Sequence, residues 1–274
     1  MTEAQAFDLD QLGRLREVAE EAAALGANIV SAAGGEPGSR KGKGGELKGL
    51  GDYVTDVDRR SESAIRTFLE EATPDIPVLG EEAGGDRGER YWAVDPLDGT
   101  TNFLIGFPAV AVSVGLVVGL ECVVGAIRAP FLGLAFSGVQ GQGAWSNGDR
   151  LGVSRRAAER AVVTTGPPFR DPSLLPRYLP ALETVLREAE DVRRPGAAAL
   201  DLAWVATGVF DGYFELNLSV WDLAAGSLLV TEAGGVVTDW DGGQRYLDGT
   251  ILAGSPATHE LLSRAAKTGR TPGR

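Results

Sequence analysis

The chain has 274 residues and a formal net charge of −12, and 43% of its residues are hydrophobic. This length and composition allow a substantial core in one large domain or two small ones, whereas the acidic balance argues against direct binding of nucleic acid or an anionic membrane, because both require clustered Lys and Arg. Residues 1–5 show no secretory-signal pattern and no uninterrupted apolar span reaches membrane length, so we expect a cytoplasmic protein without membrane contact.

Hydrophobic periodicity predicts helices and short strands in the first part of the chain. In order, these are a helix over 9–33, a helix over 61–72, short strands over 77–80 and 91–94, and an antiparallel meander of three strands over 109–137. Residues 34–51, rich in Gly and Lys, are expected to be a mobile loop without a packed element, and they contain neither of the common glycine-rich nucleotide-binding motifs.

After residue 151, helices and strands alternate. The predicted strands cover 162–165, 212–216, 236–240 and 251–254, and the predicted helices cover 182–190, 199–207, 223–233 and the C-terminal region. This mixture predicts layered helices around two sheets, rather than one doubly wound sheet. No repeat and no Pro/Ser-rich linker divides the chain.

The chain contains one cysteine and one histidine. Cys122 is the single cysteine, which excludes an intramolecular disulfide, and its apolar neighbours predict a buried thiol. His259 is the single histidine, which excludes mechanisms that need both a His base and a His ligand. Its place near the start of the last predicted helix leads us to expect a solvated side chain.

Acidic residues collect at the ends of the predicted elements, namely Asp52, Asp58, Glu81, Glu82, Asp95, Asp98 and Asp222. Hard divalent cations prefer oxygen ligands, and Mg²⁺ is held by a few carboxylates together with water and substrate phosphate. Several acids without a His or Cys cluster therefore favour a Mg²⁺ site over a Zn²⁺ site.

The stretch 92–103, Trp-Ala-Val-Asp-Pro-Leu-Asp-Gly-Thr-Thr-Asn-Phe, combines these acids with a turn. We expect Asp95 to leave the strand, Pro96 to fix the backbone, and Asp98 to face the same cations, while the amides of Gly99 and Thr100 start a helix that favours a phosphate. The alternative is an ordinary turn with a helix cap, with Asp222 as an N-cap and Glu81 as a solvated acid.

Four stretches together resemble the inositol monophosphatase family of Mg²⁺-dependent phosphatases, within the lithium-sensitive sugar phosphatase superfamily. They are 52–58 (DYVTDVD), 80–82 (GEE), 92–103 (WAVDPLDGTTNF) and 221–235 (WDLAAGSLLVTEAGG). The resemblance implies a layered αβαβα sandwich of the inositol monophosphatase and fructose-1,6-bisphosphatase type, a homodimer, and inhibition by Li⁺. It also implies one phosphatase unit, whose half of about 1–150 carries metal motifs and whose half of about 151–274 supplies Asp222 and substrate contacts.

The resemblance also assigns roles to individual residues. It implies one Mg²⁺ at Glu81, Asp95 and the Leu97 carbonyl, a second at Asp95, Asp98 and Asp222, and a third, weaker ion near Glu81. The water is implied to be activated by a pair, Asp58 and Thr100, and oriented by Glu81 and Thr100. The substrate contacts implied are Gly99 and Thr100 at the phosphate, Glu215 at a sugar hydroxyl, and Gly196 and Ala198. Many members carry Ser or Thr where this chain has Ala197, so that polar contact is lost or made by backbone.

The expected reaction is in-line attack of a metal-activated water on a phosphate monoester, without a phosphoenzyme. Because residues 215–222 look most like inositol-type members, we expect myo-inositol-1-phosphate as substrate. Fructose-1,6-bisphosphate, histidinol phosphate and adenosine 3',5'-bisphosphate stay open, because the core binds only phosphate and metal. Two other classes also stay open, a regulatory protein of the transcription machinery and a sugar- or nucleotide-binding module without metal.

Overall fold

The computed structural model describes residues 7–34, 45–49 and 52–269. In the first part the elements are α1 (Leu9–Gly34), β1 (Glu46–Gly49), β2 (Asp52–Val54), α2 (Asp56–Ala72), β3 (Val78–Gly80), β4 (Arg90–Asp98), α3 (Thr100–Ile105), β5 (Ala111–Val118), β6 (Glu121–Ala129), β7 (Leu134–Val139), β8 (Gly143–Ser146) and β9 (Asp149–Arg150). The remainder contains β10 (Val162–Gly166), α4 (Leu175–Glu188), β11 (Asp191–Arg193), α5 (Ala198–Ala206), β12 (Gly212–Leu216), α6 (Val220–Glu232), β13 (Val236–Thr238), β14 (Thr250–Gly254) and α7 (Pro256–Thr268).

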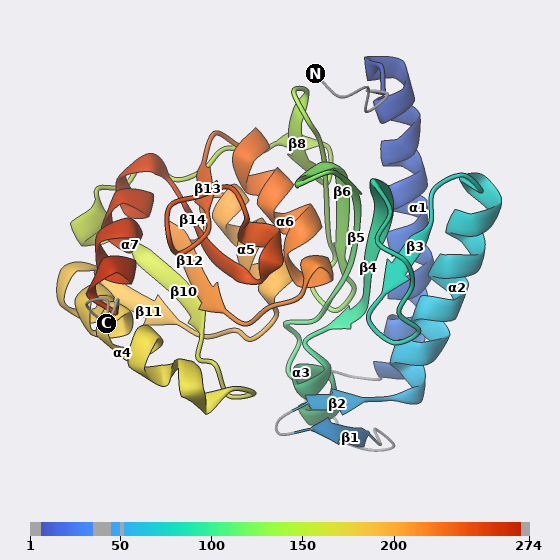
Figure 1. The fold of residues 1–274 in the computed structure, drawn as a ribbon. Coiled ribbons are helices and arrows are strands. Elements are labelled where there is room, and N and C mark those ends of the chain that lie inside the picture. Colours follow the sequence, from blue (N-terminus) through green and yellow to red (C-terminus); the bar gives the residue numbers. More distant parts are fainter. Residues whose placement is uncertain (1–6, 35–44, 50–51, 270–274) are drawn as a thin grey trace.

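Two large sheets alternate with three helical layers, which confirms the predicted αβαβα sandwich (Figure 1). The first sheet has seven strands in the order β3-β4-β5-β6-β7-β8-β9, and the second has five in the order β11-β10-β12-β14-β13. Helices α1 and α2 cover the outer face of the first sheet, α5 and α6 lie between the sheets, and α4 and α7 cover the outer face of the second. None of the helices in the described ranges combines the length and apolar composition that a bilayer crossing requires.

The composition of each helix follows from its layer. Helix α1 buries one stripe, including Leu12, Leu15 and Val30, and exposes charged residues on its other side, as expected for an outer helix. Helix α6 is buried at every position from Leu223 to Val230, because a sheet lies on each side of it. Gly125 of β6 permits the close approach of α6, since a Cβ there would lie 2.9 Å from the Ala225 Cα.

Most predicted elements are confirmed, but several bounds were wrong. Residues 46–49 of the expected loop pair with β2 as a strand, while residues 35–44 and 50–51 lie outside the described ranges. Helix α2 begins at Asp56 because Thr55 and Asp58 form a capping box, and α4 begins at Leu175 because Pro176 lies in its first turn, where no amide partner is needed. The short strands β8, β9 and β11 were not predicted.

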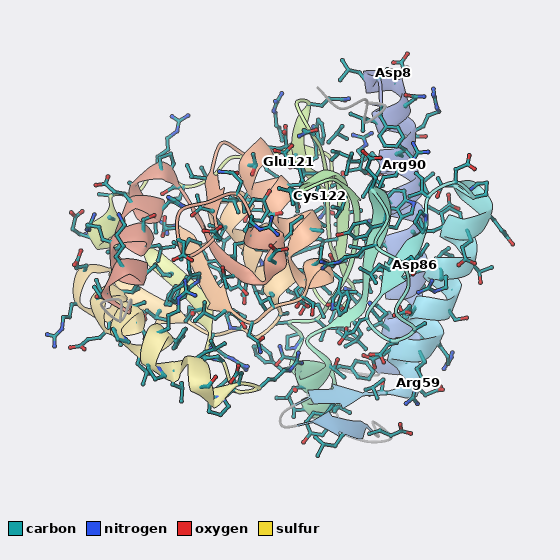
Figure 2. The ribbon with its side chains drawn as sticks, viewed as in Figure 1. Asp8, Arg59, Asp86, Arg90, Glu121 and Cys122 are labelled. Carbon is teal, nitrogen blue, oxygen red and sulfur yellow. The ribbon has the colours of Figure 1, made fainter. Side chains whose placement is uncertain are left out.

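The structure agrees with the prediction for the single cysteine but not with that for the single histidine. Cys122, labelled in Figure 2, lies buried in β6, and burial raises the pKa of its thiol. The expectation of a solvated His259 was wrong. Its ring is partly buried, lies 2.9 Å from the Thr238 hydroxyl and 3.4 Å from that of Ser263, and burial lowers its pKa.

Candidate active site

A pocket is formed where the end of β4 meets the ends of β10 and β12 and the start of α5. It contains every predicted site residue except Asp58, namely Glu81, Asp95, Leu97, Asp98, Gly99, Thr100, Gly196, Ala198, Glu215 and Asp222. The structure therefore brings together residues that are more than a hundred positions apart in the sequence.

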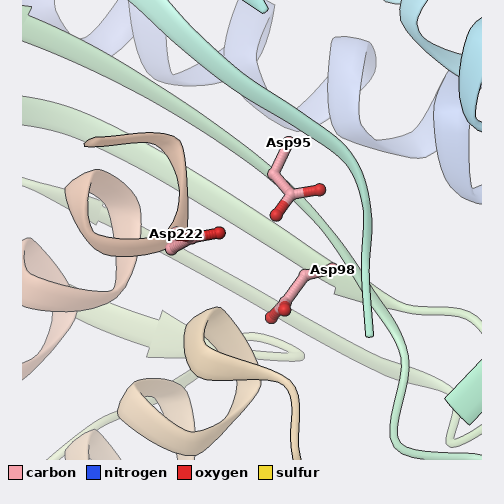
Figure 3. A group of neighbouring side chains, drawn as sticks. All are labelled: Asp95, Asp98 and Asp222. Atoms are coloured by element: carbon pink, nitrogen blue, oxygen red, sulfur yellow. The ribbon is translucent and has the colours of Figure 1, made fainter. Parts of the chain in front are cut away.

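Three carboxylates form the centre of the pocket (Figure 3). Asp95 and Asp98 extend from β4, Asp222 extends from the first turn of α6, and one oxygen of each lies within 4.8 Å of the others. Asp95 and Asp98 are buried, at 1% and 7% exposure. The prediction that the strand ends before Asp95 was wrong, because β4 continues to Asp98.

A bulge in β4 explains how Asp95 and Asp98 converge. Residues three apart on a regular strand point to opposite faces of the sheet. Here Asp95 pairs with Ser113 and Asp98 with Ala111, so β4 has one residue more than β5 over this interval. The extra residue changes the direction of the side chain that follows it. Asp95 and Asp98 can therefore point to the same side of the strand. The Leu97 amide, inside the bulge, donates to Asp95 Oδ1 at 3.0 Å.

Asp58 does not line the pocket but is hydrogen-bonded to Thr100, which does. It is fully buried in the first turn of α2, and its Oδ2 accepts the Thr55 amide at 2.8 Å. Its Oδ1 accepts the hydroxyl of Thr100 at 3.1 Å, and that hydroxyl also lies 3.2 Å from the Leu97 carbonyl. Burial raises the pKa of Asp58, while the hydrogen bonds from Thr55 and Thr100 act in the opposite direction. The predicted pair is thus in contact.

The carboxylates strongly perturb one another. Burial and the charges of Glu81, Asp98 and Asp222 raise the pKa of Asp95 well above its ordinary value. Burial and Asp222 raise the pKa of Asp98 to about 7, although backbone amides oppose the shift. Buried like charges of this kind cannot all ionise without a nearby cation. Their oxygen donors and mutual repulsion fit a site for a hard divalent metal ion.

Asp222 occupies a different helix position from the one expected. Helix α6 begins at Val220 with Ser219 as its N-cap, so the alternative that Asp222 caps a helix starting at 223 was wrong. Asp222 is the third helical residue, and its Oδ2 accepts the Ser219 amide at 2.6 Å in a capping box. This arrangement holds the side chain at the helix end that faces Asp95 and Asp98.

The segment after Gly196 supports Asp98. Gly196 adopts a φ of +84°, which favours glycine. The amides of Ala198 and Ala199 then donate to the Asp98 carboxylate at 3.2 and 2.8 Å. Ala198 lines the pocket, but its amide is bonded to Asp98 in this arrangement, so the predicted substrate contact would have to come from another atom of the residue.

Glu215 is the next-to-last residue of β12 and lines the same pocket. Its Oε2 accepts the Tyr213 hydroxyl at 2.7 Å. Burial raises its pKa to about 7, with the Tyr213 hydrogen bond opposing and the charge of Asp222 adding to the shift. Gly166 at the end of β10 leaves the space for this side chain, since a Cβ there would lie 2.0 Å from Glu215 Oε2.

Several pocket residues were missed in the sequence. Phe169 and Arg170 follow β10, and the Arg194 guanidinium lies 5.1 Å from the centre of the Phe169 ring. Ligand sites in sheets with parallel strands gather beyond the carboxyl ends of those strands. Because β10 and β12 are parallel neighbours, the position of Phe169 and Arg170 after a predicted strand was a usable signal, whereas nothing local indicated Arg194.

Comparison with known proteins agrees with this geometry. Residues 11–270 match the model of the inositol monophosphatase family. The chain belongs to this family. It is 42% identical over 223 residues to the Nus factor SuhB of Haemophilus influenzae, and the aligned region covers 79% of this chain and 84% of the relative.

Two further similarities extend over almost the whole chain. A protein of Aquifex aeolicus named fructose-1,6-bisphosphatase/inositol-1-monophosphatase is 39% identical over 262 residues, covering 94% of this chain and 97% of the relative. The crystal structure of the extragenic suppressor protein suhB from Bartonella henselae superposes with a TM-score of 0.86 and 39% identity, covering 94% of this chain and all of that chain. This family member therefore shares the fold of its solved relatives.

Proposed function

We propose that this protein is a Mg²⁺-dependent phosphate monoester hydrolase whose substrate is myo-inositol-1-phosphate. The observation that carries the proposal is the convergence of Asp95, Asp98 and Asp222 in one pocket beside Gly99 and Thr100. Family membership supports metal-dependent phosphatase chemistry. A homodimer, inhibition by Li⁺ and a cytoplasmic location remain predictions from the family resemblance.

The metal ions would be held by two overlapping sets of oxygen ligands. One set is Glu81, Asp95 and the Leu97 carbonyl, and the other is Asp95, Asp98 and Asp222, with a third ion near Glu81 in the family pattern. When bound, Mg²⁺ lowers the pKa of a coordinated water and offsets the negative charge on the phosphate and the leaving oxygen. Asp95 belongs to both sets, so its replacement is expected to affect both positions.

Thr100 is suited to orient the attacking water. Its hydroxyl lies 3.1 Å from Asp58 Oδ1 and 3.2 Å from the Leu97 carbonyl. With that carbonyl engaged by a metal ion, the one hydroxyl proton would go to Asp58, which leaves the hydroxyl lone pairs to accept a proton from a neighbour. Asp58 is itself held by Thr55. A water that donates to the Thr100 oxygen would keep a lone pair available for attack on the phosphate, which is the assistance expected of a positioned proton acceptor.

The position of Glu215 supports a polyol substrate. The carboxylate of Glu215 can accept hydrogen bonds from the hydroxyls of the leaving group, and Tyr213 holds that carboxylate in place at 2.7 Å. A half-buried carboxylate of this kind disfavours an analogue that lacks the hydroxyl, because the carboxylate then keeps only the hydrogen bond from Tyr213. This favours inositol phosphate over esters that present fewer hydroxyls to Glu215.

Phosphate release from a panel of monoesters, with and without Mg²⁺, tests the proposal on wild type and Asp95→Asn. We expect release that requires Mg²⁺, that is fastest with myo-inositol-1-phosphate, and that falls by orders of magnitude in the variant. Near-normal turnover of Asp95→Asn would contradict the metal assignment, and a large preference for histidinol phosphate or fructose-1,6-bisphosphate would contradict the substrate.

A second function, in transcription, is favoured by one observation, the 42% identity to the Nus factor SuhB of Haemophilus influenzae. Capture of RNA polymerase by the purified chain would test it. The same assay with Asp95→Asn separates the two functions, because a binding role should survive the loss of a metal ligand. Absence of capture together with Mg²⁺-dependent hydrolysis would leave the phosphatase alone.

A further inference from the structure

We propose that Glu62 and Arg66 of α2 are positioning residues that hold the turn bearing Glu81 and so determine how strongly the protein binds Mg²⁺. The inference rests on the proposed metal site. It concerns residues outside the pocket lining, and its basis is the set of hydrogen bonds between α2 and residues 78–84.

Glu62 binds the turn through its backbone amides. Its side chain is buried at 2% exposure, and its two oxygens accept the amides of Glu82 and Ala83 at 2.7 and 2.8 Å. These are the two residues that directly follow Glu81. Hydrogen bonds from amides to a charged carboxylate are short and strong, so Glu62 fixes the backbone immediately beyond the metal-binding side chain.

Gly80 shows how closely Glu62 approaches the turn. A Cβ on Gly80 would lie 2.4 Å from the Glu62 carboxyl carbon, so the glycine leaves the space that the carboxylate fills. On the other side of Gly80, the Glu81 amide donates to the Val94 carbonyl of β4 at 3.2 Å. The Glu81 amide is therefore held by β4, and the two residues that follow Glu81 are held by Glu62.

Arg66 binds the two ends of segment 78–84, which comprises β3 and the turn that follows it. Its guanidinium donates to the Val78 carbonyl at 3.0 Å and to the Gly84 carbonyl at 2.6 Å, and it lies 3.4 Å from Glu62 Oε1. The positive group thus bonds the carbonyls at the ends while the negative group bonds the amides in the middle. The Glu62 side chain is buried and that of Arg66 is 22% exposed, and the hydrogen bonds of each with residues 78–84 hold the pair in place.

The spacing of these residues places them on one face of α2. Asp58, Glu62 and Arg66 follow at steps of four, so they lie above one another along the helix. The same helix contacts the other acid-bearing segment, because the Ser61 hydroxyl donates to the Pro96 carbonyl at 2.9 Å. Helix α2 therefore holds both Glu81 and the bulge between Asp95 and Asp98, and so sets the distance between the two groups of ligands.

The test is Glu62→Gln, with Glu70→Gln as the matched control. Glu70 is also an ion-pair partner of Arg66, at 3.8 Å, but it is 58% exposed and is not bonded to the turn. Isothermal titration of Mg²⁺ alone into the full, EDTA-treated chain gives the dissociation constant, and thermal melting in EDTA gives the stability. Loss of a residue that supports metal ligands weakens metal binding by about 10- to 100-fold, and we expect that range for Glu62→Gln and no change for Glu70→Gln.

A double variant separates positioning from general stabilisation. If Glu62 acts through Glu81, adding Glu62→Gln to Glu81→Gln should leave the Mg²⁺ dissociation constant unchanged, although the melting temperature falls further. Should Glu62→Gln fail to fold, Arg66→Lys replaces it, because a single ammonium group cannot reach both carbonyls and should weaken Mg²⁺ binding in the same direction.

The outcomes are distinct. A Mg²⁺ dissociation constant for Glu62→Gln within twofold of wild type, or additive effects in the double variant, would overturn the inference while leaving the metal site intact. Wild type without measurable Mg²⁺ binding would instead overturn the proposed function on which the inference rests.

Discussion

Replacing Asp95 by Asn should make the metal-free protein more stable at neutral pH, although the variant loses activity. Asn keeps an oxygen for the Leu97 amide but removes the charge that faces Asp98 and Asp222. With an effective dielectric constant of about 20, two unit charges 4.8 Å apart repel by about 3.5 kcal/mol. Removing Asp95 eliminates two such repulsions, or about 7 kcal/mol if all three acids are ionised.

Protonation limits this penalty in the wild type. Each pH unit above the ordinary value of 3.8 costs about 1.4 kcal/mol to keep the Asp95 carboxyl protonated, so holding it neutral at pH 7 costs about 4 kcal/mol. The energetic penalty of the wild-type cluster at pH 7 is therefore at most about 4 kcal/mol, because protonation of Asp95 is an alternative to the full repulsion. Because the folded-state pKa is raised, stability is fully present below pH 3.8 and is lost as the pH rises toward the folded pKa.

Urea unfolding in EDTA, from pH 4 to pH 7, measures the difference. We expect the free energies of unfolding of Asp95→Asn and wild type to be similar at pH 4. At pH 7 we expect the variant to be more stable than wild type by up to about 4 kcal/mol. Millimolar Mg²⁺ should stabilise the wild type and have little effect on the variant. The reasoning would be refuted by an Asp95→Asn variant less stable than wild type at pH 7 in EDTA, or by a difference independent of pH.

Asp211→Asn provides the control. Asp211 is also buried, but it faces Arg156 at 2.7 Å and accepts the Val162 amide at 2.7 Å, away from the pocket. The Asp211 carboxylate is fully buried and the Arg156 side chain is 45% exposed, so Asn at this position removes the ion pair and leaves a weaker, uncharged acceptor for the Val162 amide. Asp211→Asn should therefore be less stable than wild type at pH 7, and its response to Mg²⁺ should be unchanged.

Three further predictions address single residues. Thr100→Val should lower kcat by about a hundredfold or more while Mg²⁺ still binds, because only the hydroxyl that orients the water is lost; unchanged turnover would contradict its role. Gly166→Ala places a methyl group 2.0 Å from Glu215 Oε2, so KM for myo-inositol-1-phosphate should rise while the Mg²⁺ titration stays constant, and an unchanged KM would argue against Glu215 as a substrate contact. Burial lowers the pKa of His259, so stability should fall as the pH drops from about 6.5 toward the folded-state pKa, and unfolding of His259→Asn should lack that slope.

Local sequence determined several helices and strands of this protein and the chemical type of its candidate site. The periodicity of 9–33 and of the meander 109–137 sufficed to place α1 and β5 to β7, because an element that buries one face repeats its apolar residues with its own period. The combination of several acids with a single histidine indicated oxygen ligands for a hard cation. The family motifs named the residues that later proved to line one pocket.

Tertiary structure decided the rest. Only the pairing of β4 with β5 reveals the bulge that turns Asp95 and Asp98 to the same side, and only the packing of α6 between two sheets brings Asp222 to them. The bonds from Glu62 and Arg66 to residues 78–84 are also invisible in the sequence, where these residues read as charges on a helix. Periodicity indicates which face of an element is buried. The element that packs against this face is determined by contacts between residues distant in the chain, and a local sequence pattern contains no information about those contacts.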